Sequence, residues 1–267
     1  MTSTQMLLVA GAAALAAAGF GAASDAPPEI VTETVEYRDG DVVLEGYLAY
    51  DRSLEGKRPG VMVVHEWKGH GPYVRRRAEE LAKLGFVAFA ADMYGKGVFA
   101  KDHEEAGRLA GVYLGDRALM RRRANAGLDV LRKHARVEPG KLAVMGYCFG
   151  GTAALECARA GLDGVRGVAS FHGNLATPTP AARGAVTAKV IVFHGADDGM
   201  VAKGVDPFQN EMRTAGADWQ FVTFGGAVHS FTVKEAGDDP ARGIAWHEPS
   251  DRRSWKMLQD FLAEALR

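Results

Sequence analysis

Residues 142–155 read LAVMGYCFGGTAAL, and this stretch decides the predicted fold. An apolar strand turns through glycines around Cys148 and continues into small residues that suit the start of a helix. This is the nucleophile-elbow pattern, with Cys in the place of Ser. Gly146 and Gly150 remove side chains that would collide across the tight turn. Cys148 is therefore the candidate nucleophile, at a helix N-terminus whose dipole and free N–H groups stabilise a thiolate.

The segments around this elbow alternate between strand and helix. Two stretches with period-two alternation, 31–37 and 42–50, flank Asp39-Gly40 and predict a hairpin. Further strands are expected at 60–64, 86–90, 141–145, 165–171, 190–194 and 219–223, and helices at 73–83, 102–114, 117–134, 150–160, 205–214 and 254–266. The predicted fold is α/β, a mostly parallel sheet with an antiparallel N-terminal hairpin and helices on both faces.

The bulk composition favours a globular protein that does not bind nucleic acid. The chain has 267 residues, is 47% hydrophobic and carries a net charge of −1. Nucleic-acid binders usually carry a clear excess of basic residues. The arginine triplets 75–77 and 121–123 are expected on solvated helix faces. We expect a monomer.

The N-terminal residues differ from the rest of the chain. Residues 6–23 carry no charged side chain and are rich in Ala, Leu and Gly, and the small residues 21–23 suit a signal peptidase. We interpret residues 1–26 as a signal peptide or a retained membrane anchor, and residues 27–267 as one domain. The expected location is periplasmic or secreted, with a cytoplasmic protein as the alternative. Membrane contact is expected through the leader alone.

The two cysteines are predicted to have different roles. Cys148 and Cys157 lie nine residues apart in one helix and its entry turn. That spacing separates them by roughly 13 Å along the helix axis. A disulfide needs Cα atoms within about 7 Å, so we expect no bridge. Cys157 sits in the middle of the helix and is interpreted as structural.

Polar residues follow several of the predicted strands, and these strand ends meet at one edge of a parallel sheet. His229 follows the last strand and is the candidate base. Asp197 and Asp198 follow the strand before it, and one of them is expected to orient the His229 ring. Spacing alone does not choose between them. The order nucleophile, acid, base along the chain is that of hydrolases with an elbow. The N–H of Phe149 is a candidate oxyanion donor.

Glu66 is a further acidic candidate because it follows the first buried strand. A carboxylate shielded there by Trp67 is expected to have a raised pKa and to exchange a proton with the thiol. The alternative is a loop salt bridge with Lys68. His65 and His70 flank this segment, but the spacing typical of metal sites is missing, so no metal and no cofactor are expected.

Five short segments together resemble the dienelactone hydrolase family of the α/β-hydrolase superfamily. They are HEWKG (65–69), ADMY (91–94), GYCFGG (146–151), GADD (195–198) and HSF (229–231), and the resemblance extends from Val31 to the C-terminus. It implies a triad of Cys148, Asp198 and His229, and so favours Asp198 over its neighbour. It also implies that Glu66 helps to generate the thiolate and that Trp67 and Phe149 supply oxyanion-hole N–H groups.

Candidate substrate contacts lie beside these segments. They are Tyr94, Lys96, Tyr147, His172 and Ser230. The resemblance leads us to expect arginines that hold a substrate carboxylate, but Lys96 and Val233 stand at those positions. Lys is a poorer bidentate partner for carboxylate than Arg. Dienelactone itself is therefore not assigned as the substrate.

The predicted function is hydrolysis of a small carboxylic ester or lactone through a Cys148 acyl-enzyme, without a cofactor. Two alternatives remain open. One is a thioesterase or peptide hydrolase that uses the same triad. The other is a non-catalytic ligand-binding protein of the same fold.

Overall fold

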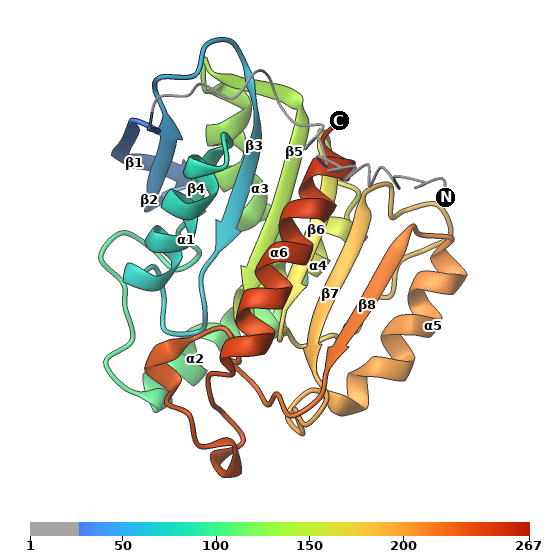
Figure 1. Ribbon diagram of the computed structural model, residues 1–267. Coiled ribbons are helices and arrows are strands. Elements are labelled where there is room, and N and C mark those ends of the chain that lie inside the picture. Colours follow the sequence, from blue (N-terminus) through green and yellow to red (C-terminus); the bar gives the residue numbers. More distant parts are fainter. Residues whose placement is uncertain (1–26) are drawn as a thin grey trace, which may run out of the picture.

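The computed structural model describes residues 27–267 and contains one eight-stranded sheet of order β1-β2-β4-β3-β5-β6-β7-β8 (Figure 1). The strands are β1 (Ile30–Asp39), β2 (Val42–Asp51), β3 (Arg58–Val64), β4 (Val87–Ala91), β5 (Val137–Tyr147), β6 (Val165–Phe171), β7 (Lys189–Gly195) and β8 (Trp219–Phe224). The helices are α1 (Pro72–Lys83), α2 (His103–Gly115), α3 (Arg117–Lys133), α4 (Phe149–Arg159), α5 (Val205–Ala215) and α6 (Glu248–Ala265).

The predicted fold class is confirmed. β1 and β2 form an antiparallel hairpin, β2 pairs antiparallel with β4, and all other pairs are parallel. The register aligns Val64 of β3 with Gly146 of β5, and Tyr147 of β5 with Phe171 of β6. Residues that follow these three strands therefore lie side by side at one edge of the sheet.

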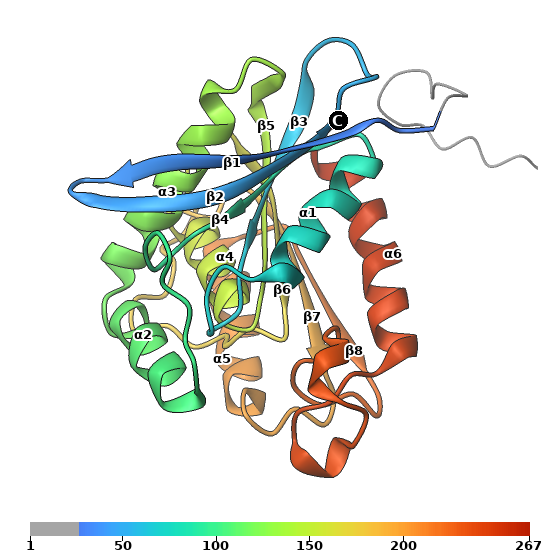
Figure 2. The ribbon, with the colours of Figure 1, turned by 90° about the vertical axis from the view of Figure 1, so that its left-hand side faces the viewer.

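Helices cover both faces of the sheet, as Figures 1 and 2 show. Along β3, Val61 and Val63 belong to the core under α1 and α6, whereas Met62 and Val64 belong to the core under α3, α4 and α5. Successive side chains of a strand point to opposite faces, so a strand buried on both sides reads as a continuous apolar run.

The arginine triplets differ from the prediction of solvated helix faces. Arg77 is 7% exposed and Arg123 is 3% exposed. Three consecutive helical residues span about 200° of the helix surface, so one of them must face inward. Nη2 of Arg77 lies 2.6 Å from the Asp251 carboxylate in α6, and Nε of Arg123 lies 2.9 Å from the Asp39 carboxylate in β1. Each buried guanidinium is thus paired, as burial of a charge requires.

The closing helix α6 begins at Glu248, six residues before the expected start. Pro249 occupies the first turn, where a missing N–H costs nothing. The polar first turn has no apolar repeat that would reveal it in the sequence.

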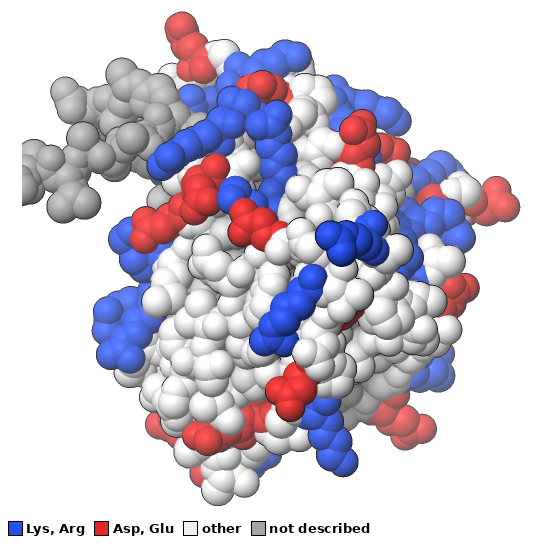
Figure 3. Space-filling view, turned by 90° about the vertical axis from the view of Figure 1, so that its right-hand side faces the viewer, with Lys and Arg blue, Asp and Glu red and all other residues white. Residues whose placement is uncertain are grey.

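Figure 3 shows the face that carries α5 and the free edge of β8, with Lys and Arg interspersed among Asp, Glu and uncharged residues. Lys189 of β7 forms ion pairs with both Asp218 and Glu264. Within residues 27–267, no helix combines the length and the apolarity needed to span a bilayer. The predicted leader, residues 1–26, lies outside the described residues.

Candidate active site

Cys148 lies in a sharp turn between β5 and α4. Its backbone has φ 53° and ψ −113°, in the left-handed half of φ space that non-glycine residues seldom adopt. A Cβ on Gly146 would lie 2.2 Å from the Gly150 carbonyl carbon, and one on Gly150 would lie 2.2 Å from the Val64 carbonyl oxygen. The bend therefore needs glycine at both positions. It leaves the Cys148 side chain partly exposed.

The structure brings Cys148, His229 and Asp198 together at the carboxyl edge of the sheet. Nε2 of His229 lies 3.2 Å from Sγ of Cys148, and Nδ1 lies 2.8 Å from Oδ2 of Asp198. Asp198 is fully buried, and its other oxygen accepts a hydrogen bond from the N–H of Met200 at 3.0 Å. Asp197 is exposed, so the contact that spacing left open is made by Asp198.

The partners of His229 change its protonation. Burial alone would lower the pKa of the imidazole, but the hydrogen bonds with Asp198 and Cys148 outweigh it and raise the pKa to about 10. A neighbouring carboxylate and a thiolate both favour the imidazolium form. The arrangement can therefore hold an imidazolium–thiolate pair.

Glu66 is partly buried beside this pair. Burial raises the pKa of its carboxyl to about 7, and the negative charge of Glu235 also raises it, while His229 and Lys68 lower it. Within residues 27–267 no hydrogen bond or ion pair holds the Glu66 carboxylate, so the alternative of a salt bridge with Lys68 is not formed. The group is left free to exchange protons.

Hydrogen bonds from His65 and Tyr94 hold the loop that carries Glu66 and Trp67. His65 accepts a hydrogen bond from the Met93 N–H at Nε2 (3.1 Å) and donates from Nδ1 to the Glu66 carbonyl (2.5 Å). The Tyr94 hydroxyl donates to the Trp67 carbonyl at 2.8 Å. In the described part of the chain, neither the N–H of Trp67 nor that of Phe149 donates to an acceptor. Both predicted oxyanion donors are therefore available.

Two predicted substrate contacts are buried instead. Tyr147 is fully buried, and its ring packs 4.7 Å from Phe171 and 5.0 Å from Tyr73, because the strand places it beneath the elbow. His172 is 1% exposed, and both of its ring nitrogens are hydrogen-bonded to protein atoms. These two side chains support the elbow from inside the core, in contrast to the prediction.

The other three candidates occupy different positions. Tyr94 is buried and holds the Trp67 loop. Lys96 reaches back to the hairpin, where it pairs with Glu36 at 2.8 Å and with Glu45 at 3.6 Å. Ser230 follows His229 in a left-handed conformation with φ 58°, and its carbonyl accepts from the Val233 N–H. Tyr94 lies near the sulfur, since burial and then the charge of Cys148 raise the pKa of its hydroxyl, whereas Lys96 is held at the hairpin.

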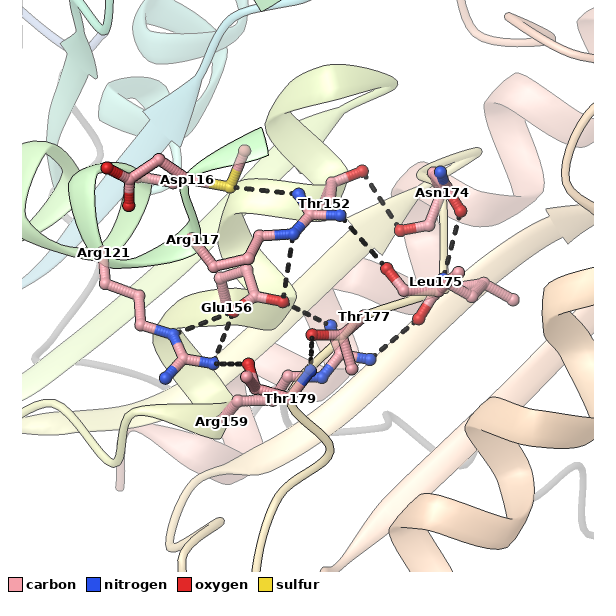
Figure 4. Close-up of polar contacts among 12 residues, drawn as sticks. Asp116, Arg117, Arg121, Thr152, Glu156, Arg159, Asn174, Leu175, Thr177 and Thr179 are labelled. Carbon is pink, nitrogen blue, oxygen red and sulfur yellow. Dashed lines mark hydrogen bonds and ion pairs between the residues drawn. The ribbon is translucent and has the colours of Figure 1, made fainter. Parts of the chain in front are cut away.

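A buried ion network beneath α4 was not predicted from the sequence (Figure 4). Glu156 is fully buried and pairs with Arg121 of α3 and with Arg159 of its own helix. Arg159 also forms a two-pronged pair with Glu211 of α5 and donates to the Leu175 carbonyl. The network fastens the connection between β6 and β7 to the helix that bears the nucleophile. The one clue was a Glu–Arg pair three residues apart in an apolar helix.

The remaining polar candidates have no place at this site. Cys157 is fully buried and free, and burial raises the pKa of its thiol to about 12. The His70 Nε2 donates to the Ala90 carbonyl at 3.1 Å. Among residues 27–267, no three His, Cys, Asp or Glu side chains are grouped as metal ligands.

The sheet order, the elbow between β5 and α4, and the histidine after β8 define an α/β-hydrolase. The chain belongs to the dienelactone hydrolase family, whose model matches residues 44–266. The protein is thus a hydrolase of ester or lactone bonds, and the predicted resemblance is confirmed.

Several known proteins are similar to this chain. The solved structure of m3DLH is 36% identical with a TM-score of 0.85, covering 89% of this chain and 99% of that one. A dienelactone hydrolase-like promiscuous phosphotriesterase from metagenomic libraries is also 36% identical, with a TM-score of 0.84 and the same coverage. Protein usf of Aquifex pyrophilus is 28% identical over 88% of this chain and 99% of its own length.

Proposed function

We propose that this hydrolase cleaves a small, activated ester or lactone through a covalent thioester on Cys148. The observation that carries the proposal is the continuous contact from Asp198 through His229 to a partly exposed sulfur, with distances of 2.8 and 3.2 Å. A nucleophile, a base and a group that orients the base are the parts that acyl transfer requires.

The proposed first step is attack of the Cys148 thiolate on the carbonyl carbon. The N–H groups of Trp67 and Phe149, which have no other acceptor within the described residues, donate to the oxyanion. The C–O bond then breaks, and the leaving oxygen takes the proton from the His229 imidazolium. In the second step His229 takes a proton from water, the resulting hydroxide attacks the thioester, and the acid leaves as the thiolate re-forms.

Glu66 supports formation of the thiolate in this scheme. Burial raises the pKa of its carboxyl group to about 7, and the group lies close enough to His229 for the imidazolium charge to oppose that rise. A carboxylate with that pKa can accept the thiol proton near neutral pH. We therefore assign Glu66 as the group that helps to set the protonation of the free enzyme.

Activated substrates suit this nucleophile. A thiolate is a better leaving group than an ordinary alkoxide, so a tetrahedral intermediate built on sulfur returns to substrate unless the competing group leaves readily. Enol lactones, aryl esters and thioesters meet this condition. We expect all three to be cleaved faster than simple alkyl esters.

The test is a substrate panel combined with alkylation. The panel contains p-nitrophenyl esters, an enol lactone, a thioester and, because one relative is named a phosphotriesterase, a p-nitrophenyl phosphotriester. Cys148→Ala should lower kcat on the carboxylic substrates by at least about 10³-fold. Iodoacetamide should inactivate the native protein with one label on Cys148, and Cys157→Ala should label and turn over like the parent. Full activity of Cys148→Ala on every substrate would overturn the proposal.

A further inference from the structure

A chain of hydrogen bonds behind the nucleophile ends on its backbone. The N–H of Cys148 donates to the Phe171 carbonyl at 2.9 Å and also to Nδ1 of His172 at 3.2 Å. Nε2 of His172 lies 2.9 Å from Oγ1 of Thr232, and that hydroxyl lies 2.8 Å from the Tyr73 hydroxyl. His172, Thr232 and Tyr73 do not belong to the catalytic set assigned above.

This chain of hydrogen bonds fixes the tautomer of the His172 ring. Because Nδ1 accepts the Cys148 N–H, it carries no proton, and the ring proton must sit on Nε2. There it donates to Thr232, whose hydroxyl is the acceptor that this form requires. The opposite tautomer would place two N–H groups against each other at the elbow. A neutral ring with its proton on Nε2 is thus the only form that is compatible with both of these hydrogen bonds.

The far end of the chain is anchored by a charge. Nε of Arg77 donates to the Tyr73 hydroxyl oxygen at 3.3 Å, and its Nη2 donates to the Thr232 carbonyl at 3.4 Å. Arg77 is itself held by Asp251 of α6. The position of Thr232 is therefore determined by α1 and α6, which are distant from the elbow in the sequence.

His172 also contacts the base. Its ring meets the His229 ring edge to face, with centroids 5.2 Å apart. The charged or titratable groups near its ring are His229 after β8, Arg77 of α1, Tyr147 at the end of β5 and Cys148, while the Tyr73 hydroxyl lies one hydrogen bond further away, on Thr232. Two cations are thus nearby whenever His229 is an imidazolium, and they favour a neutral His172. Burial and His229 both lower the pKa of His172 well below its usual value.

We propose that His172 and Thr232 are positioning residues for the nucleophile: Thr232 holds His172 in the tautomer that accepts the Cys148 N–H, and this bond keeps Cys148 in its left-handed conformation, aimed at His229. The inference rests on the proposed function of Cys148 for its kinetic consequence. The tautomer itself can be measured without turnover.

The test compares Thr232→Val with Thr232→Ser. Val has nearly the shape of Thr but leaves the Nε2 proton of His172 without an acceptor, whereas Ser keeps the hydroxyl. A buried N–H group that has lost its acceptor carries a free-energy cost equivalent to a change of about tenfold or more in a rate constant. We expect Thr232→Val to lower kcat about tenfold with little change in KM, and to slow alkylation of Cys148 with a displaced pH profile. Thr232→Ser should restore both to within about threefold. Thr214→Val, an exposed Thr→Val change in α5, should behave like the parent.

Nitrogen NMR of the His172 ring provides the second measurement on the unmodified protein. The expected signals are those of a neutral ring protonated at Nε2, from mildly acidic to mildly alkaline pH. A ring protonated at Nδ1, or a folded Thr232→Val variant with the kcat and alkylation profile of the parent, would overturn the inference. If instead Cys148→Ala were active while His172 showed the expected tautomer, the proposed function would fail and the positioning contact would stand.

Discussion

Two buried polar clusters of this protein satisfy their charges in different ways. Beneath α4, the guanidinium of Arg159 contacts both oxygens of Glu211, one oxygen of Glu156 and the Leu175 carbonyl. At the carboxyl edge of the sheet, the sulfur of Cys148 has His229 as its hydrogen-bond partner, and the Glu66 carboxylate has none among residues 27–267. The first cluster uses nearly all of its bonding capacity, whereas the second leaves capacity for a substrate.

This difference separates stability from chemistry. A buried charge with several partners is costly to disturb, because loss of one partner leaves the others uncompensated. A group that must form and break bonds needs a free side and a shifted pKa. We therefore expect loss of the Asp198 charge to alter rate more than stability, and loss of the Arg159 pairs under α4 to do the reverse.

The largest effect is expected for Asp198→Asn. The amide keeps the size of the side chain but removes the negative charge that stabilises the His229 imidazolium and fixes its ring. We expect kcat to fall by about 10³-fold with little loss of melting temperature, as measured by steady-state kinetics and calorimetry. Asp197→Asn is the matched control, because that neighbour is exposed, and it should stay within about twofold. Equal, mild losses in both variants would show that neither carboxylate orients the base.

The sequence predicted the contacts among Cys148, His229 and Asp198 that the structure shows. Gly146 and Gly150 around Cys148 reveal the elbow because no other residue fits the bend; Asp198 follows the apolar run of β7, and His229 follows β8. The choice of Asp198 over Asp197 needed the resemblance, since neighbours in the chain differ only in the direction of their side chains.

The partners of the buried polar side chains could not be predicted, because they depend on contacts between distant segments. Arg159 and Glu211 lie 52 positions apart, and nothing local marks either as buried. His172 was predicted to face the substrate because it follows a strand, but its φ of 40° turns the ring into the core. Likewise, the burial of Arg77 depends on Asp251 in the last helix. Patterns of period and spacing identify elements, but they do not identify the partners of a buried charge.

The second prediction concerns Arg159→Met, which removes the cation shared by Glu156 and Glu211 but keeps most of the apolar stem. Breaking a buried pair in this way costs about 3–5 kcal/mol. We expect the free energy of unfolding, measured in urea, to fall by that amount. At a temperature where the variant is folded, kcat should remain within about threefold of the parent.

A surface pair provides the control for this comparison. Arg252 and Glu248 of α6 form an ion pair at 3.1 Å with both side chains more than half exposed. Arg252→Met should change the free energy of unfolding by about 0.5 kcal/mol or less. If Arg159→Met kept the stability of the parent but lost turnover, the ion network would have to be counted with the catalytic machinery.

The smallest effect is expected for Glu66→Gln, and its sign depends on pH. The pKa of the Glu66 carboxyl is about 7 in the folded protein against an ordinary value of 4.5. As pH rises between these values, the unfolded chain loses its proton first, so the native state becomes less stable. Gln carries no such penalty. Above pH 7 we expect the variant to exceed the parent by about 1–3 kcal/mol in free energy of unfolding, and at pH 4 the two should be equal.

Alkylation of Cys148 near neutral pH should nevertheless slow several-fold in Glu66→Gln, because the proton acceptor is gone. Glu104→Gln, an exposed change in α2, should show neither effect. A parent and a Glu66→Gln variant with parallel stability curves from pH 4 to about pH 8 would mean that Glu66 ionises normally and has no part in generating the thiolate.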